Sequence, residues 1–367
     1  MRVLICGGGA IGAAVAYFLS CRGIAATVVE STGLACAASG KAGGFLARDW
    51  CDGTPLDALA RRSFALHARL PQEIGGEWGY RRLDTFSGIA GASRRGEPRG
   101  LAWLSGKVAI ARRLGAPQTT AQVHPAAFTA ALMRAAASRG AELRRGRVTA
   151  IRCRNGRVEG VEVDGECVAG DAVVVALGPW SILAAQWLPL PAVFGLKGHS
   201  LVFDTGTRVP AEAAFIDYRE RNGAVQSPEL FPRPDGTTYV CAIASESPLP
   251  LDPAAVAPDP GAIERLEMIC RDLSPVLAGA KILARQACYR PITRDSLPVI
   301  GPVPGVTGAY VATGHSVWGI LNAPATGEAI AELIAEGAAH TVDLTPFAPG
   351  RLPPLDPASL RIAGAGA

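Results

Sequence analysis

The segment at residues 7–12, Gly-Gly-Gly-Ala-Ile-Gly, has the glycine spacing of a loop that binds phosphate groups. An apolar run at residues 3–6 precedes it, and a helical apolar pattern follows at residues 11–19. A tight turn between a strand and a helix directs free backbone N–H groups and the positive end of the helix dipole at a pyrophosphate. A second apolar run at 26–29 ends on Glu30, which is placed to accept a hydrogen bond from a ribose hydroxyl. The order of these parts predicts a dinucleotide site.

Two further glycine-rich stretches occur along the chain. Residues 39–45, Ser-Gly-Lys-Ala-Gly-Gly-Phe, form a loop of small residues. Residues 310–313 form an apolar strand that ends at Gly314, and a helix is predicted from Pro324 to Glu336. A two-domain nicotinamide dehydrogenase would not need the additional loops, so it remains only an alternative.

The elements that must position these loops are of two kinds. Buried strands and helices of the parallel α/β type alternate with a stretch of antiparallel strands, Pro-rich turns and one amphipathic helix at 263–273. The chain therefore predicts an α/β fold with two interleaved domains. The first domain is predicted at residues 1–78, 122–190 and 285–345, the second at 79–121 and 191–284, and a tail at 346–367.

Several local elements have clear sequence signals. Asn155-Gly156 and Asp164-Gly165 predict tight hairpin turns between short strands. His124-Pro125 marks the start of a helix, and Thr54-Pro55 starts another that we expect to end near Pro71.

Composition excludes several classes of function. The net charge is only +4 over 367 residues and the arginines are scattered, which argues against nucleic-acid binding. No apolar run reaches the ~20 residues of a membrane span, and the apolar N-terminus belongs to the glycine-loop unit rather than to a signal peptide. The nine cysteines are odd in number and lack a CxxC pair, which indicates reduced thiols in the cytoplasm. The five histidines have no metal-ligand spacing, so no metal is expected, and the final Ala-Gly-Ala-Gly-Ala is expected to fray.

Over nearly its whole length the chain resembles the D-amino acid oxidase family of FAD enzymes, which includes glycine oxidase and sarcosine oxidase. The resemblance rests on the first glycine loop, the loop at 39–45, the strand end Ala176-Leu177-Gly178-Pro179-Trp180 and the segment 312–327. It implies a glutathione-reductase-like, Rossmann-type FAD-binding domain interleaved with an α+β antiparallel-sheet substrate domain. The residues that it assigns to FAD are Gly7, Gly9, Ala10, Ile11, Gly12, Glu30, Ser31, Ser39, Gly40, Lys41, Gly43, Gly44, Phe45, Val148, Ala176, Leu177, Gly178, Trp180, Gly314, His315, Ser316, Val317, Trp318, Gly319 and Ile320.

The same resemblance points to substrate-binding residues. Arg290 falls where the family pairs an arginine with the substrate carboxylate, for which a planar guanidinium is well suited. Glu229 falls where glycine oxidase has an active-site tyrosine, and Val317 where it has a second arginine. These differences favour a larger or more cationic amine over glycine, although Glu229 is equally compatible with a rim charge or a salt-bridge partner.

Three other side chains have two interpretations each. Lys197 would assist oxygen reduction if it lay near flavin N5, but it is also compatible with a solvent-facing lysine. Trp318 either walls the flavin pocket or is an ordinary core aromatic residue. Cys288 lies where sarcosine oxidase attaches FAD covalently, but the Tyr-Arg-Pro that follows is typical of the non-covalent branch.

The resemblance implies an FAD-dependent oxidoreductase that oxidises the C–N bond of a small amine or amino acid to an imine. Hydride passes to flavin N5, and O2 is expected to reoxidise the flavin to give H2O2. Two alternatives remain open: a flavin dehydrogenase with a quinone or protein acceptor, and a flavin-binding protein without turnover. The sequence predicts no oligomeric state.

Overall fold

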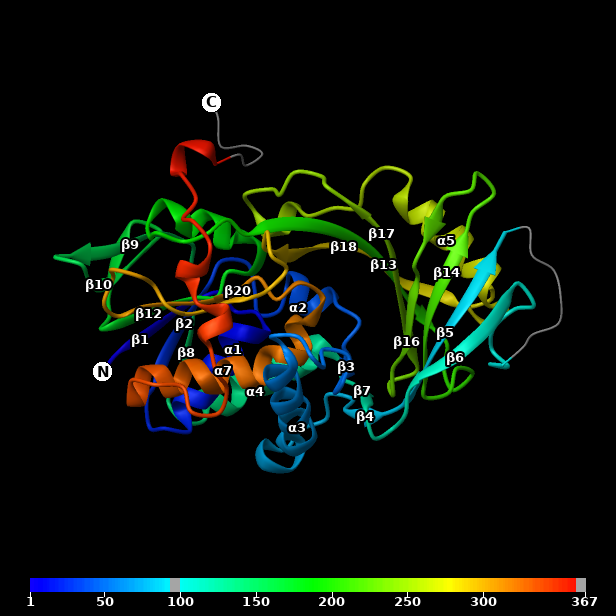
Figure 1. Ribbon diagram of the computed structural model, residues 1–367, viewed down its shortest axis with the longest axis horizontal. Coiled ribbons are helices and arrows are strands. Elements are labelled where there is room, and N and C mark those ends of the chain that lie inside the picture. The colour runs from blue at the N-terminus through cyan, green and yellow to red at the C-terminus, as the bar shows by residue number, and fades with distance from the viewer. Residues whose placement is uncertain (93–99, 361–367) are drawn as a thin grey trace.

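The computed structural model describes residues 1–92 and 100–360 and contains two large sheets (Figure 1). The first has six strands in the order β19-β20-β12-β1-β2-β8. Four of the five neighbouring pairs are parallel, and only β19 runs antiparallel to its neighbour β20. Its strands are β1 (Val3–Cys6), β2 (Ala26–Glu30), β8 (Glu142–Arg145), β12 (Ala172–Val175), β19 (Val299–Pro302) and β20 (Ala309–Thr313).

Both faces of the six-stranded sheet are covered, which explains the continuous apolar runs in its strands. Val3 and Ile5 face a helical layer, whereas Leu4 and Cys6 face the small sheet β9-β10-β11. The helices are α1 (Ala10–Ser20), α3 (Asp57–Ile74), α4 (Pro125–Ala137) and α7 (Gly319–Glu336), and the small sheet is β9 (Val148–Arg154), β10 (Arg157–Val163) and β11 (Glu166–Ala169).

The second sheet has eight strands along the path β18-β13-β17-β16-β14-β5-β6, with β15 paired to β14. Helix α5 (Ala262–Leu273) covers one of its faces, and the other face turns toward the first sheet. The long strands β13 and β18 run from one part of the molecule to the other (Figure 1). The strands are β5 (Asp84–Gly91), β6 (Val108–Gly115), β13 (Phe194–Asp204), β14 (Glu212–Arg219), β15 (Val225–Gln226), β16 (Glu229–Pro232), β17 (Thr237–Ser245) and β18 (Lys281–Ile292).

Smaller elements join the two parts. The sheet β3-β7-β4 lies between the two large sheets in Figure 1 and consists of β3 (Phe45–Ala47), β4 (Arg81–Arg82) and β7 (Thr120–Gln122). Helix α2 (Ala38–Lys41) and the 3₁₀ helices η1 (Gly178–Gln186) and η3 (Ser316–Trp318) occupy the loops after strands of the first sheet. Within the described residues, no helix is both long and apolar enough to cross a bilayer.

The fold class predicted from the sequence is confirmed, as are several local elements. Asn155 and Asp164 have φ values of 51° and 50° and form the turns of the hairpins β9–β10 and β10–β11. His124 accepts the backbone N–H of Ala127 and caps α4, as the His-Pro pair predicted. The expected domain boundary at residue 285 falls inside β18, which pairs with β13 in the second sheet. The final Ala-Gly-Ala-Gly-Ala lies outside the described residues.

Two helix boundaries were predicted wrongly, both at prolines. Helix α3 continues past Pro71 to Ile74, because a proline in the last turn removes only one hydrogen bond before Gly75 ends the helix. Helix α7 begins at Gly319 and contains Pro324 in its interior.

Long-range contacts explain why α7 tolerates Pro324. Proline has no N–H, so the carbonyl of Ile320 loses its helical partner. The Nε2 of His67 lies 2.9 Å from that carbonyl oxygen and 3.1 Å from that of Leu321. The Oγ of Ser63, one turn earlier on α3, accepts the N–H of Ala325 at 3.0 Å. Helix α3 therefore supplies the hydrogen bonds that the proline removes, and the first turn of α7 remains helical.

His67→Phe should destabilise the protein because it leaves two buried carbonyl groups unpaired. We expect a loss of about 1–3 kcal/mol in the free energy of unfolding, measured by urea denaturation. Ser138→Ala is the matched control, since the Oγ of Ser138 donates to a helical carbonyl at an exposed position. The control should change the free energy by less than about 0.5 kcal/mol. Equal effects of the two substitutions would contradict this role of His67.

Candidate functional site

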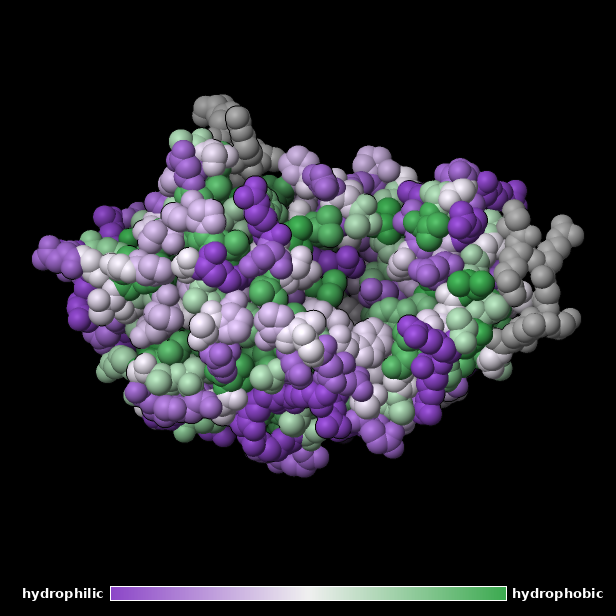
Figure 2. Space-filling model, viewed as in Figure 1, coloured by the Kyte–Doolittle hydropathy of each residue, from purple (hydrophilic) through white to green (hydrophobic). Residues whose placement is uncertain are grey.

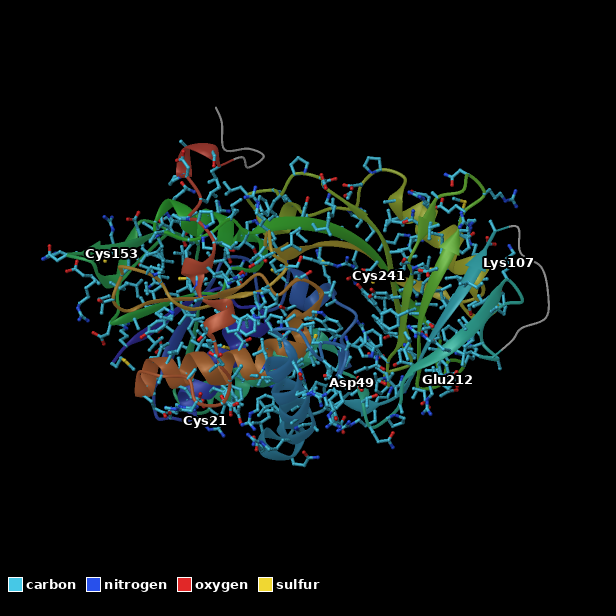
Figure 3. The ribbon with its side chains drawn as sticks, in the orientation of Figure 1. Cys21, Asp49, Lys107, Cys153, Glu212 and Cys241 are labelled. Atoms are coloured by element: carbon cyan, nitrogen blue, oxygen red, sulfur yellow. The ribbon has the colours of Figure 1, made fainter. Side chains whose placement is uncertain are left out.

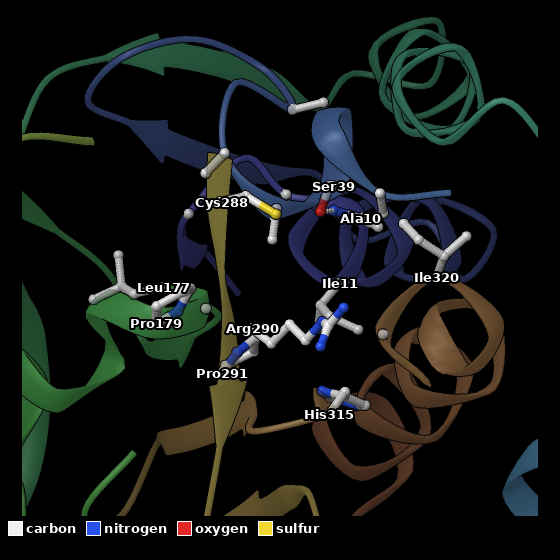
Figure 4. Close-up of a pocket in the computed structure, with 18 of the residues that line it drawn as sticks. Ala10, Ile11, Ser39, Leu177, Pro179, Cys288, Arg290, Pro291, His315 and Ile320 are labelled. Atoms are coloured by element: carbon white, nitrogen blue, oxygen red, sulfur yellow. Dashed lines mark hydrogen bonds between the residues drawn. The ribbon is translucent and has the colours of Figure 1, made fainter. Parts of the chain in front are cut away.

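A large cavity lies between the two sheets, and residues from at least eight separate segments line it (Figure 4). At one end are the loops that follow β1, β2 and β12, and at the other is the inner face of the eight-stranded sheet. In Figure 4, Ser39 and Ala10 lie side by side, whereas Cys288, Arg290 and Pro291 follow one another along β18. On the outer face shown in Figure 2, hydrophilic and hydrophobic residues are interspersed.

The first glycine loop has almost no room for side chains. Gly7 has a φ of 113°, and a Cβ there would lie 2.3 Å from the carbonyl oxygen of Ala176. A Cβ on Gly12 would lie 2.0 Å from the carbonyl oxygen of Gly7, so α1 approaches the turn as closely as backbone atoms allow. The first turn of α1 contains no acidic residue and directs its N–H groups at the cavity. This cradle fits a pyrophosphate.

The ends of β2 and α2 complete the cradle. The carboxylate of Glu30 accepts the N–H groups of Gly8 at 2.7 Å and Thr32 at 2.8 Å and also borders the cavity. The hydroxyl of Ser39 accepts the N–H of Ala10 at 2.9 Å, which joins the second glycine loop to the start of α1. Glu30 is thus fixed where a ribose next to the pyrophosphate would lie.

Most residues assigned to FAD from the sequence border this one cavity. Those that do so are Gly7, Gly9, Ala10, Ile11, Glu30, Ser31, Ser39, Gly43, Gly44, Phe45, Val148, Ala176, Leu177, Gly178, Trp180, His315, Ser316, Val317, Trp318, Gly319 and Ile320.

The other four lie behind the lining. Gly12 packs on Gly7, and a Cβ on Gly40 would lie 1.9 Å from the carbonyl oxygen of Ala35. The Nζ of Lys41 donates to the carbonyl of Ala287 at 3.2 Å, while Gly314 has a φ of 77°. These four shape the loops without facing the cavity.

His315 sits in the turn that leads into α7. It is 4% exposed, and burial lowers the pKa of its imidazole to about 3, so the ring is neutral. Its Nε2 lies 3.0 Å from the hydroxyl of Thr326, which is inside α7. His315 therefore ties the turn to the helix and does not carry a proton at neutral pH.

Arg290 projects from β18 into the cavity. Gly198 on the neighbouring strand borders it, and a Cβ there would lie in ordinary van der Waals contact with the guanidinium, 3.5 Å from Nη2. Strand alternation turns Tyr289 to the opposite face, where its hydroxyl donates to Pro248. Arg290 and Cys288 share the cavity face, and burial raises the pKa of the Cys288 thiol.

Aromatic side chains cover the inner face of the second sheet, and we call this set the aromatic wall. Phe45 stacks on Phe231 at 5.3 Å between ring centroids, and Trp50 lies 5.0 Å from Phe215. The members of the aromatic wall are Phe45, Trp50, Phe215, Phe231, Tyr239 and Trp318.

Of the aromatic wall, only Phe45 and Trp318 were identified from the sequence as cavity residues. The signal that was missed is strand alternation, because Phe231 shares a face with Glu229, and Tyr239 with Cys241. Figure 3 places Cys241 near the middle of the molecule, whereas Cys21 and Cys153 lie at the periphery.

Glu229 stands within the aromatic wall. Burial raises the pKa of its carboxyl group, an effect opposed by the charge of Arg290 and by a hydrogen bond from Cys241. The Sγ of Cys241 lies 3.4 Å from Oε2 of Glu229.

Lys197 does not face the cavity. Its ammonium group is 2.6 Å from Oδ1 of Asp259 and donates to the carbonyl of Ala257, and it lies over the ring of Tyr289. It is 7% exposed, so the solvent-facing interpretation is wrong as well. Because β13 turns Lys197 away from its neighbour Gly198, we leave this lysine out of the proposed site.

Comparison with known proteins gives consistent matches. A family model described as FAD dependent oxidoreductase matches residues 2–333. An oxidoreductase of Schizosaccharomyces pombe is 29% identical over 94% of this chain and 96% of its own length. Glycine oxidase of Pseudomonas aeruginosa is 27% identical over 96% of this chain and 99% of its own. The crystal structure of glycine oxidase from Geobacillus kaustophilus aligns with a TM-score of 0.79 and 28% identity, over 95% of this chain and 98% of that one.

The buried neutral state of His315 predicts a pH dependence of stability. Its pKa is about 3 in the folded protein against an ordinary value of 6.5, so the unfolded chain binds the additional proton below pH 6.5. Stability should therefore be complete above that pH and fall toward pH 3, by up to about 1.4 kcal/mol per pH unit. His67, whose pKa is lowered to about 4, should add to the fall.

Urea midpoints at a fixed FAD concentration, compared at pH values between about 7 and 5, would measure this effect. The variant His315→Gln keeps a polar side chain but does not titrate, so its midpoint should fall less steeply than that of the parent. Parallel curves for the two proteins would contradict the buried neutral state of His315.

Proposed function

The chain belongs to the FAD-dependent oxidoreductase family of amine and amino-acid enzymes, and from this membership we propose which reaction it performs. The proposed reaction is oxidation of the C–N bond of an amino acid that carries a bulky apolar or aromatic group, giving an imine. The observation that carries the proposal is that Arg290, the aromatic wall and the first glycine loop border a single cavity.

FAD bound at the glycine loops would accept hydride from the substrate carbon that bears nitrogen, with O2 as the proposed final acceptor. Glu30 and the start of α1 would hold the adenosine end of FAD. The N-terminal turn of α7 borders the same cavity and would stabilise negative charge at the pyrimidine end of a flavin. Neutral His315 ties the loop before α7 to Thr326 in the body of that helix.

Positioning of the substrate is assigned to the second sheet. The guanidinium of Arg290 can pair with the substrate carboxylate through two parallel hydrogen bonds. The aromatic wall would contact the remainder of the substrate and exclude water from the reacting bond. Glycine would leave this apolar surface uncovered, so the preference is for a larger amino acid.

Arg290→Ala should selectively impair carboxylated substrates. Hydrogen bonds to charged groups contribute about 1.5–3 kcal/mol to binding. Their loss predicts that kcat/KM falls by roughly 10- to 100-fold, mostly because KM rises. Steady-state kinetics on an amino acid and on the matching amine without a carboxylate would measure it, with FAD content unchanged. Arg294→Ala, an exposed arginine nearby, is the control. Equal losses on both substrates would exclude Arg290 from carboxylate binding.

We further propose that FAD is held without a covalent bond. The raised pKa of the Cys288 thiol disfavours the thiolate that forms such a bond. Acid precipitation of the yellow protein should release all flavin colour to the supernatant, and Cys288→Ser should retain a full complement of FAD. Colour that stays in the precipitate of the parent and disappears in Cys288→Ser would overturn this proposal.

A further inference from the structure

The carboxylate of Glu229 lies in an apolar part of the cavity without a counter-ion. Among the described residues, its side chain has one hydrogen-bond partner, Sγ of Cys241 at 3.4 Å, and it forms no ion pair. The rings of Phe215 and Phe231 occupy the neighbouring positions of the same sheet face. Burying an unpaired carboxylate costs free energy, so this position favours a ligand that brings a positive charge or a proton.

Within the part of the chain that the structure describes, none of the titratable or charged groups around Glu229 forms an ion pair with its carboxylate. Strand β17 contributes Tyr239 and Cys241, whose own pKa values are raised by burial and which are therefore neutral. Strand β18 contributes Cys288 and Arg290, and β14 contributes only the apolar Phe215. Lys41, on α2, donates to a backbone carbonyl of β18.

Arg290 is the one strong charge of this group that acts on Glu229. It lowers the pKa of the carboxyl group, but burial has the larger effect in the opposite direction. The two side chains form no ion pair although they line the same cavity. A guanidinium and a carboxylate held apart in one apolar cavity match the two ends of a zwitterion.

We propose that Glu229 accepts a proton from the ammonium group of the amino acid whose carboxylate binds Arg290. This inference rests on the proposed function. In the proposed step an N–H bond of the ammonium breaks and its proton forms an O–H bond with the Glu229 carboxylate. The electron pair of the broken bond stays on nitrogen as the lone pair of a neutral amine.

This proton transfer is needed before hydride can leave the substrate carbon. Loss of hydride from carbon gives an iminium only if nitrogen can donate a lone pair, which an ammonium group lacks. Most amino-acid molecules at neutral pH carry the ammonium form, so the enzyme must remove that proton or wait for the rare neutral form. In a site of low dielectric, the transfer replaces two opposite charges by two neutral groups, which apolar surroundings favour.

The test is the pH dependence of flavin reduction in Glu229→Gln, which keeps the shape of the side chain but cannot accept the proton. Anaerobic stopped-flow mixing with phenylalanine, as the D, L or N-methyl form that reduces the parent fastest, gives the rate constant. The parent should change little around neutral pH. Glu229→Gln should be slower by roughly 10²-fold near neutrality and should gain about tenfold per pH unit as the free amine forms.

Binding of phenylpropionate, the analogue without nitrogen, supplies a readout independent of turnover. Perturbation of the flavin spectrum should show that Glu229→Gln binds this anion at least as tightly as the parent, because a like charge has been removed. Phenylalanine should bind more weakly to the variant. Reversal of these two effects would overturn the inference.

Two further variants act as controls. Glu229→Asp retains a carboxylate and should restore the flat pH profile. Asp217→Asn removes an exposed carboxylate from the neighbouring strand β14 and should behave as the parent. Identical profiles for the parent and Glu229→Gln, with flavin reduced in both, would reject the role of Glu229 alone. A parent flavin that no amino acid reduces would reject the proposed function itself.

Discussion

The close contact between α1 and α7 determines where the whole site can form. Gly327 of α7 meets α1 at Ala14, and a Cβ on that glycine would lie 2.6 Å from the backbone carbon. Gly12 brings α1 close to the turn at Gly7, where a Cβ would lie 2.0 Å from the carbonyl oxygen of Gly7. Because both helices are buried against the same sheet face, their N-terminal turns open into one cavity. One turn suits the pyrophosphate of FAD, and the other suits the electron-rich end of a flavin.

Pro324 interrupts the backbone hydrogen bonding of α7, and side chains of α3 replace the lost hydrogen bonds. Ser63 and His67 lie one turn apart and satisfy the backbone groups that the proline frees. Neutral His67 thus holds the first turn of α7, and neutral His315 contacts Thr326 further along the same helix. The groups of α3 and of the preceding loop that contact α7 here are therefore uncharged at neutral pH.

The sequence was informative wherever a feature depends on neighbours along the chain. The glycine loops and the hairpins at Asn155 and Asp164 follow from local spacing and were predicted. The start of α7 was not predicted, because it depends on a side chain of α3 more than two hundred residues away. The aromatic wall was missed for a related reason. Its members come from strands that meet only through the sheet order, and that order is a property of the tertiary fold. The burial of Lys197 was not foreseen either, because its ion-pair partner Asp259 lies 62 residues further along the chain.

The chemistry that we propose divides between the two sheets. The first forms the proposed cofactor cradle, built largely from backbone, in which Gly7 and Gly12 leave no room for a Cβ atom. The second presents one cation, one carboxylate and a broad aromatic surface, and these decide which amine is accepted. Glu229, which we propose to contact the substrate, lies in this second layer and not in the cofactor cradle.

The central claim, that this cavity oxidises a bulky zwitterionic amino acid by means of FAD, is tested most directly by anaerobic titration of the purified yellow protein. The titrants are glycine and the D, L and N-methyl forms of phenylalanine and leucine, and the visible flavin absorbance is followed. The account predicts that one stereochemical series of the bulky amino acids bleaches the flavin, that glycine does so far more slowly, and that colour returns when air is admitted. Bleaching by glycine at least as fast as by phenylalanine and leucine, or no bleaching by any of them, would contradict it.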